Sequence, residues 1–241
     1  PTDGERILTS EHALRLEQLP GRAVILGGGV IGVEFASLWR DLGVDVVLVE
    51  ARPHLLPNED PDLVAVLERR LRARGVDLRL GAKAEGIVRD GDQVRLELSD
   101  GTVTADVALI AVGRRPVTGG LGLEEAGVAL TSTGHVSATR ELATTTAGVF
   151  AVGDLIAGPQ LAHRGYAHGI FLAEHLAHLS GGRPIRPRPP EDLDIPRITY
   201  SSPQLASVGL TREQAAATGG CEVSDFDLRG NARALMLAPG D

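Results

Sequence analysis

The chain has 241 residues, 43% of them hydrophobic, and a net charge of −8 at pH 7. This length and composition are sufficient for one large globular domain or two small ones. Acidic and basic residues are interspersed and the balance is acidic, which argues against nucleic acid as a partner. No apolar run approaches the roughly twenty residues of a membrane span, and no secretory leader is recognisable. We therefore expect no membrane partner and a cytoplasmic location.

Cysteine and methionine are each present only once, as Cys221 and Met236. A lone cysteine cannot form an internal disulfide, and its neighbours lack the spacing of a zinc site. We expect no metal and interpret Cys221 as a small apolar or surface residue. Because the chain begins at Pro1, we expect a fragment, a processed product or an incompletely ordered polypeptide.

The most informative motif follows the apolar run at residues 24–26 and has the pattern Gly-x-Gly-x-x-Gly. Gly27 lets the chain turn sharply, and Gly29 removes a Cβ that would block a phosphate. Gly32 lets the following helix pack closely against the preceding strand. A strand, these glycines and an apolar-periodic helix in this order predict a dinucleotide site.

The helix and a second strand complete this motif. Val30 and Ile31 begin the helix, whose first amides point at the bound phosphate, and Gly43 stops it. The second strand ends at Glu50, where a carboxylate accepts hydrogen bonds from ribose hydroxyls and disfavours a 2′-phosphate. We therefore predict NAD as the cofactor, although Arg52 nearby keeps NADP open. The alternative is a glycine-rich turn in a structural βαβ unit.

After Glu50 the hydrophobic pattern predicts further helices and strands. One helix is expected to begin at Pro61 and stop at Gly75, and another to span residues 161–179. Asp-Gly turns predict an antiparallel meander. The expected strands span residues 76–80, 84–88, 94–98, 102–104, 107–112, 147–154, 197–200 and 205–208. The fold class is therefore α/β, with a Rossmann-like three-layer domain that includes the meander.

Several motifs, taken together and in order, resemble the flavoprotein disulfide reductases, and within that family the dihydrolipoamide dehydrogenase branch. They lie at residues 27–34, 50, 111–116, 144–154, 161–163 and 200–211. The resemblance implies electron transfer from a lipoyl or other dithiol, through an enzyme disulfide and FAD, to NAD. It also implies a homodimer.

The same resemblance implies a domain order. Residues 1–20 would be a linker from a preceding FAD-binding segment, and residues 21–115 the NAD-binding domain. Residues 116–190 would be the returning part of the FAD-binding domain. Residues 191–241 would begin an α+β interface domain.

For the NAD site, the resemblance places Glu34 beside the nicotinamide, paired with a lysine that this chain does not contain. The alternative is that Glu34, in the first turn of the helix, only interacts favourably with the helix dipole. Gly113, which follows the expected strand 107–112, is a further candidate residue of the NAD site.

For the FAD site, the resemblance implies that Gly153 and Asp154 approach the flavin, with Asp154 bonded to the ribityl hydroxyls. Asp154 can alternatively be a turn or helix-capping residue. Leu161, Ala162 and His163 lie at a predicted helix start, where backbone amides favour negative charge on a reduced flavin. Three more histidines match no motif and are expected to have surface or packing roles: His168, His175 and His178.

The redox cysteine pair of the family is not in this chain, and neither is the histidine–glutamate pair that acts as acid and base. Thiolate exchange needs a second sulfur and a proton acceptor, so we do not expect this chain to oxidise a dithiol by itself. We expect weak or no FAD binding, and dimerisation can be lost. The alternatives are a mercuric-type reductase, a soluble transhydrogenase or a non-catalytic dinucleotide-binding module.

Overall fold

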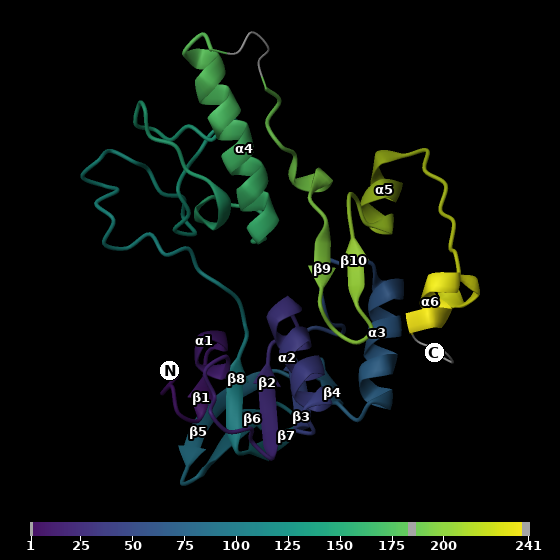
Figure 1. Cartoon of the computed structure of the whole chain (residues 1–241). Coiled ribbons are helices and arrows are strands. Elements are labelled where there is room, and N and C mark those ends of the chain that lie inside the picture. The colour runs from purple at the N-terminus through teal and green to yellow at the C-terminus, as the bar shows by residue number, and fades with distance from the viewer. Residues whose placement is uncertain (1, 183–186, 238–241) are drawn as a thin grey trace. The chain divides into compact units, whose positions relative to one another are not determined.

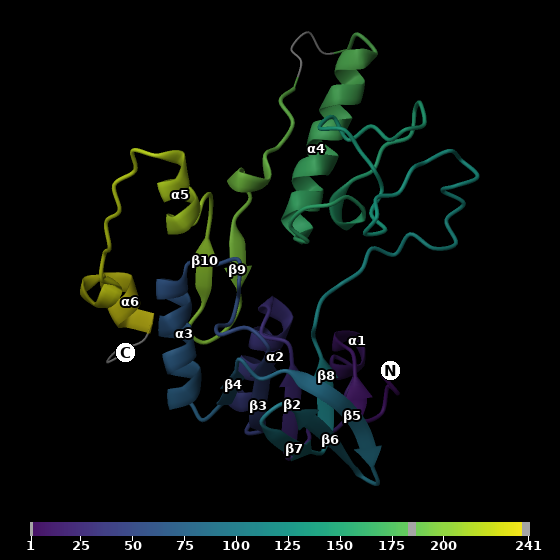
Figure 2. The same cartoon turned by 180° about the vertical axis from the view of Figure 1, so that it is seen from behind.

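The computed structural model describes residues 2–182 and 187–237. The chain divides into two compact units, Pro1–Gly209 and Leu210–Asp241. Figures 1 and 2 show the elements of both units from opposite sides. The candidate site residues all lie in the first unit.

A parallel sheet forms the centre of the first unit, with strand order β1-β8-β2-β3-β4. Its strands are β1 (Ile7–Leu8), β2 (Arg22–Leu26), β3 (Asp45–Glu50), β4 (Asp77–Leu80) and β8 (Val107–Ile110). The predicted strands before and after the glycine motif are thus confirmed. The segment expected to be a linker also contributes a strand, β1, which pairs with β8.

Helices cover one face of this sheet and a second sheet covers the other (Figure 1). Because strand side chains alternate between faces, Ile25 and Leu48 pack against the helices, whereas Val24 and Val47 pack against the second sheet. The helices are α1 (Ser10–Ala13), α2 (Val30–Asp41) and α3 (Pro61–Ala73). The antiparallel second sheet contains β5 (Ala84–Asp90), β6 (Gln93–Leu98) and β7 (Gly101–Ala105). The predicted three-layer α/β fold with a meander is confirmed.

Helix α2 buries one side of its surface in the helix layer. Val33, Ala36 and Trp39 are buried, while Leu38 and Leu42 are exposed. Leu38 lies outside the buried side of α2, and Leu42 follows the last residue of the helix, so not every apolar residue of this segment contributes to the core. The packing of this buried side nevertheless holds the start of α2 near the end of β2, where the glycine loop lies.

The region after β8 contains helix α4 (Ala162–Leu179) and the short 3-10 helix η1 (Gly153–Leu155). The predicted helix at 161–179 is confirmed, but the predicted strand at 147–154 is wrong. Within the described residues, Phe150 makes only an isolated bridge to Ala143. A strand needs a continuous hydrogen-bonding neighbour, and an apolar run cannot supply one.

A short hairpin, β9 (Arg197–Thr199) and β10 (Leu205–Ser207), follows the 3-10 helix η2 (Asp192–Asp194). Both predicted strands are confirmed. Leu205 belongs to the same buried cluster as α2 and α3, and the Ser202 amide donates to Ser37 Oγ on α2 at 2.9 Å. The hairpin therefore packs against the helix layer of the parallel sheet.

The second unit contains α5 (Arg212–Thr218), η3 (Leu228–Gly230) and α6 (Ala232–Leu237). Thr211 and Gln214 form a capping box at the start of α5. None of the residues that the structure describes in this unit is buried. Across the described parts of the chain, no helix is both long and apolar enough to cross a membrane.

Candidate functional site

Of the three motif glycines between β2 and α2, two leave little room for a side chain. Gly27 has φ of +113°, and a Cβ there would collide with the Ala111 carbonyl. A Cβ at Gly32 would collide with the Gly27 carbonyl. Beside Gly29, in contrast, no atom lies within 4 Å of the place a Cβ would take. The loop is thus tight where it turns and packs, and open where an anion would approach.

Helix α2 begins directly at this open space. Gly29 is its N-cap, and because glycine has no side chain, no capping side chain covers the first amides of the helix. The first amides of a helix lack intrahelical acceptors and carry partial positive charge. Those of Val30 and Ile31 therefore lie where a pyrophosphate can accept hydrogen bonds.

Glu50 at the end of β3 is held next to the loop by backbone amides. Its Oε2 accepts from the Gly28 amide at 2.6 Å, and its Oε1 accepts from the Arg52 amide at 2.8 Å. Each carboxylate oxygen has a second acceptor position, so both remain able to accept a ribose hydroxyl. The Arg52 residue itself is exposed.

A pocket of about 490 Å³ opens at the start of α2. Six of the predicted site residues line it: Gly29, Val30, Ile31, Glu34, Gly113 and Leu161. The structure therefore brings candidates for the NAD half and one candidate for the FAD half to the same cavity. Segments that are far apart in the sequence, including the start of β9, complete its wall.

Glu34 lies near the start of α2, where its carboxylate has a fixed partner. Oε1 accepts a hydrogen bond from the Tyr200 amide at 2.8 Å. The bond holds the carboxylate against the residue that follows β9. The first turn of α2 contains no acidic residue, so the expected position of Glu34 in that turn is wrong, and a hydrogen bond from the Tyr200 amide fixes its carboxylate instead.

Sequence reasoning missed an ion pair in the pocket wall. Arg197 Nε lies 3.0 Å from Glu59 Oε1, and the two side chains are 22% and 7% exposed. These residues are separated by 138 positions, and no spacing rule connects them. Only the folded chain reveals the pair.

The start of α4 is fixed by the side chain of His163. Its Nε2 lies 2.6 Å from the Pro196 carbonyl oxygen. Because a carbonyl only accepts, Nε2 carries the proton in this contact. The His163 ring is therefore used structurally, while the amides of Leu161 and Ala162 belong to the helix start at which a flavin was expected.

Gly153 is held from two sides by buried polar groups. Its amide donates to His168 Nδ1 at 3.1 Å, and its carbonyl accepts from Arg164 at 3.2 Å. Burial, together with the Arg164 guanidinium, keeps the pKa of His168 below its ordinary value, although Asp192 opposes the effect. Asp154 beside Gly153 is exposed. The backbone next to Asp154 is thus well fixed, and its carboxylate faces solvent.

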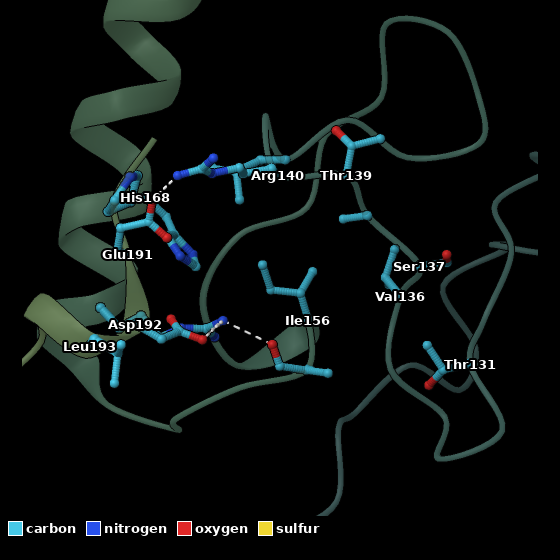
Figure 3. Close-up of a pocket in the computed structure, with 15 residues that line it drawn as sticks. Thr131, Val136, Ser137, Thr139, Arg140, Ile156, His168, Glu191, Asp192 and Leu193 are labelled. Atoms are coloured by element: carbon cyan, nitrogen blue, oxygen red, sulfur yellow. Dashed lines mark hydrogen bonds and ion pairs between the residues drawn. The ribbon is translucent and has the colours of Figure 1, made fainter. Parts of the chain in front are cut away.

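A second pocket of about 460 Å³ lies against this part of the chain (Figure 3). Arg164 is buried in its wall and pairs with Asp192 at 2.6 Å. Arg140 pairs with Glu191 at the same segment. The first ion pair attaches η2 to α4, and the second attaches the residue before η2 to the loop that contains Arg140. His168 and His175 of α4 are buried, in accordance with packing roles.

Cys221 is a free, exposed cysteine. Among the described residues, no group of His, Cys, Asp and Glu side chains is arranged to hold a metal ion. The described part of the chain therefore offers neither a redox disulfide nor a metal centre. The candidate site therefore consists of the glycine loop, the adjoining pocket and the start of α4.

Comparison with known proteins matches this arrangement. The sequence profile of the pyridine nucleotide-disulphide oxidoreductase family matches residues 1–169, and that of its dimerisation domain matches residues 195–240. Dihydrolipoyl dehydrogenases from Bacillus subtilis and Trypanosoma brucei brucei are 35% and 38% identical to the chain. The alignments cover 99% and 100% of this chain, but 50% and 51% of the relatives.

A solved structure gives the same result for the fold. A Cu(II) complex of a mutant of the HOCl-induced flavoprotein disulfide reductase RclA from Escherichia coli matches with a TM-score of 0.88 at 34% identity. The match covers 98% of this chain and 52% of that one. The chain thus spans about half the length of the relatives it matches.

Proposed function

Because the chain belongs to the pyridine nucleotide-disulphide oxidoreductase family, we propose that it forms the NAD-binding portion of a dihydrolipoamide dehydrogenase-like flavoenzyme. In the whole protein this enzyme passes hydride between FAD and NAD and oxidises a lipoyl or small-molecule dithiol. One observation carries the proposal: the open space at Gly29 lies at the start of α2, and the amide of the neighbouring Gly28 fixes the carboxylate of Glu50.

The residues of the glycine loop fit a dinucleotide by their chemistry. The amides of Val30 and Ile31 would hold the pyrophosphate, and Glu50 would accept from the ribose hydroxyls next to it. A 2′-phosphate at that position would lie against the carboxylate and be repelled. Glu50 therefore supports NAD over NADP, and the exposed Arg52 is the residue through which NADP can still be accommodated.

Bound NAD supplies the nicotinamide ring that accepts or donates hydride. Glu34 lies in the pocket wall with its carboxylate fixed by the Tyr200 amide. We propose that Glu34 orients the nicotinamide half, with Gly113 providing a side-chain-free approach at the end of β8. Both residues act by position, because Gly113 has no side chain and the Glu34 carboxylate is held by a hydrogen bond.

For the FAD half, we propose that Asp154 and the first amides of α4 approach the flavin. Asp154 is exposed next to the fixed backbone of Gly153, so its carboxylate is accessible to hydroxyl donors. Because the relatives are about twice as long as this chain, we expect FAD to bind weakly here. A flavin absorbance band in the purified chain would contradict this expectation.

The proposal includes partners and domain boundaries. The match to a dimerisation domain over residues 195–240 supports a homodimer of the whole protein. We assign residues 21–115 to the NAD-binding domain, 116–190 to the FAD-binding domain and 191–241 to the interface domain. Dithiol oxidation would use cysteines outside this chain, because Cys221 has no second sulfur.

The likeness to RclA supports a second candidate within the same family. That protein is named a flavoprotein disulfide reductase. It is 34% identical to the chain, which is close to the 35% of the Bacillus subtilis dihydrolipoyl dehydrogenase. A mercuric-type reductase or a transhydrogenase belongs to the same group of alternatives. All of them would use the glycine loop in the same way.

The test exploits the open space at Gly29. Its φ is −75° and a Cβ would touch nothing, so Gly29→Ala leaves the fold intact and places a methyl group where the phosphate would lie. We expect NADH to bind at least about tenfold more weakly, which corresponds to roughly 1.4 kcal/mol, with an unchanged Tm. Gly169→Ala, which also adds a methyl in open space, is the control. Equal NADH affinity of both variants would contradict the proposal.

A further inference from the structure

The buried ion pair between Glu59 and Arg197 joins two walls of the pocket. Glu59 lies on the loop before α3, and Arg197 is the first residue of β9. Their Nε–Oε1 distance is 3.0 Å, and only 7% of the Glu59 side chain is exposed. Taking a carboxylate out of water is costly unless a partner compensates it. The buried carboxylate in this wall therefore needs the arginine beside it.

Glu59 depends heavily on Arg197. The second carboxylate oxygen, Oε2, is buried and has no hydrogen-bond partner among the described residues. Arg197 in turn donates to the Gly209 carbonyl at 3.4 Å. Removing the arginine would leave the Glu59 charge buried without this compensation. The position of β9 therefore determines whether the buried Glu59 carboxylate keeps its charged partner.

The short segment that begins at Arg197 is held at both ends. Arg197 binds Glu59, and three residues later the Tyr200 amide binds Glu34 on α2. Between them, Ile198 and Thr199 line the pocket. The two contacts together set the distance between this segment and the start of α2.

The topology of the sheet identifies the part of a dinucleotide that this segment faces. Glu50 ends β3 on one side of β2, whereas β8 lies on the other side and leads to Gly113. With the pyrophosphate at Gly29 and the adenosine ribose at Glu50, the remaining half extends past β2 towards β8. The pocket reaches that side through Ala111, Gly113 and Arg114, while residues 56–59, which follow β3, form another part of its wall with Arg197.

We propose that Glu59 is a positioning residue for the nicotinamide half of the dinucleotide and acts by holding Arg197 and the β9 segment against the pocket. The inference rests on the proposed NAD site. Glu59 does not touch the reacting atoms in this role. It fixes the wall against which the ring is placed.

The test compares two ligands that differ in the nicotinamide. NADH contains it and ADP-ribose does not, so a wall that faces only this half affects NADH alone. For Glu59→Gln and Arg197→Met, we expect NADH to bind about tenfold more weakly while ADP-ribose changes by less than about twofold. In the double variant the losses should be less than additive, because both changes remove one pair. Glu11→Gln, which weakens an exposed ion pair with Arg15, is the control.

The outcomes are distinguishable. Equal weakening of NADH and ADP-ribose would reduce the pair to a structural contact and overturn the inference. Unchanged NADH affinity in folded variants, checked by Tm, would overturn it as well. If the unmodified chain binds neither ligand, the proposed function itself fails, and the inference with it.

Discussion

The layers around β2 and the region around α4 carry the two halves of the proposed site on different kinds of scaffold. β2 is hydrogen-bonded to β3 and β8 along its length, and buried hydrophobic clusters lie on both faces of the sheet. The α4 region contains a smaller cluster: Val128, Val136, Leu142, Ala151, Ile156 and Phe171. Its backbone around Gly153 is fixed instead by Arg164 and His168.

The difference shows how each half obtains its geometry. In the first region, close backbone packing fixes the glycine loop, and the shape of the loop is a consequence of the sheet. In the second, buried charged and titratable groups take part of this role. Disturbance of packing should therefore destabilise the first region, whereas loss of charge or a change of pH should destabilise the second.

The largest effect is expected at Gly32. Gly32→Ala places a methyl group into the Gly27 carbonyl, which backbone shifts must relieve, and we expect a loss of about 3 kcal/mol in the free energy of unfolding. Urea unfolding measures it. Gly29→Ala, the same change in open space, should cost little. If the two variants are equally stable, close packing does not determine the loop.

In the α4 region, Arg164→Met removes the ion pair with Asp192 and the donors to the Gly153 and Ala157 carbonyls. We expect a loss of about 2 kcal/mol, less than for a fully buried pair because Asp192 is half exposed. Amide hydrogen exchange should accelerate at Gly153 and leave β2 unchanged. Arg15→Met, at an exposed pair, is the control. Uniform acceleration in both regions would contradict the division.

A smaller effect is expected from His168, whose pKa is lowered by burial and by Arg164. The unfolded histidine titrates near pH 6.5. Below that pH the unfolded chain binds the proton more readily than the folded one, so stability falls as the pH drops from 7.5 to 5. His168→Asn preserves an acceptor for the Gly153 amide and removes the titration. Its stability should depend less on pH in this window; an identical slope would refute the assignment.

Local sequence patterns predicted the first region well. The motif from Gly27 to Gly32 and the acidic residue at Glu50 depend on short-range spacing, which the βαβ unit preserves. Alternating and helical periodicities gave the strands and helices around it. The apolar run at 147–154 gave a wrong strand, since pairing depends on a neighbour that the run itself does not specify.

The long-range contacts of the site could not be predicted. Glu59 and Arg197 are separated by 138 positions, and Glu34 meets the Tyr200 amide across 166. His168 was expected to be a surface or packing residue, but it is also an acceptor for the Gly153 amide. Each contact depends on how whole elements pack, and a single sequence contains no pattern for it.

The most direct test is the ratio of the dissociation constants for NADH and NADPH. The carboxylate of Glu50, fixed by the amides of Gly28 and Arg52, should make NADH bind at least about tenfold more tightly. Glu50→Gln, which retains acceptor capacity but removes the charge, should bring the two values together. Equal affinity for both dinucleotides in the unmodified chain would contradict the assignment of this loop as an NAD site.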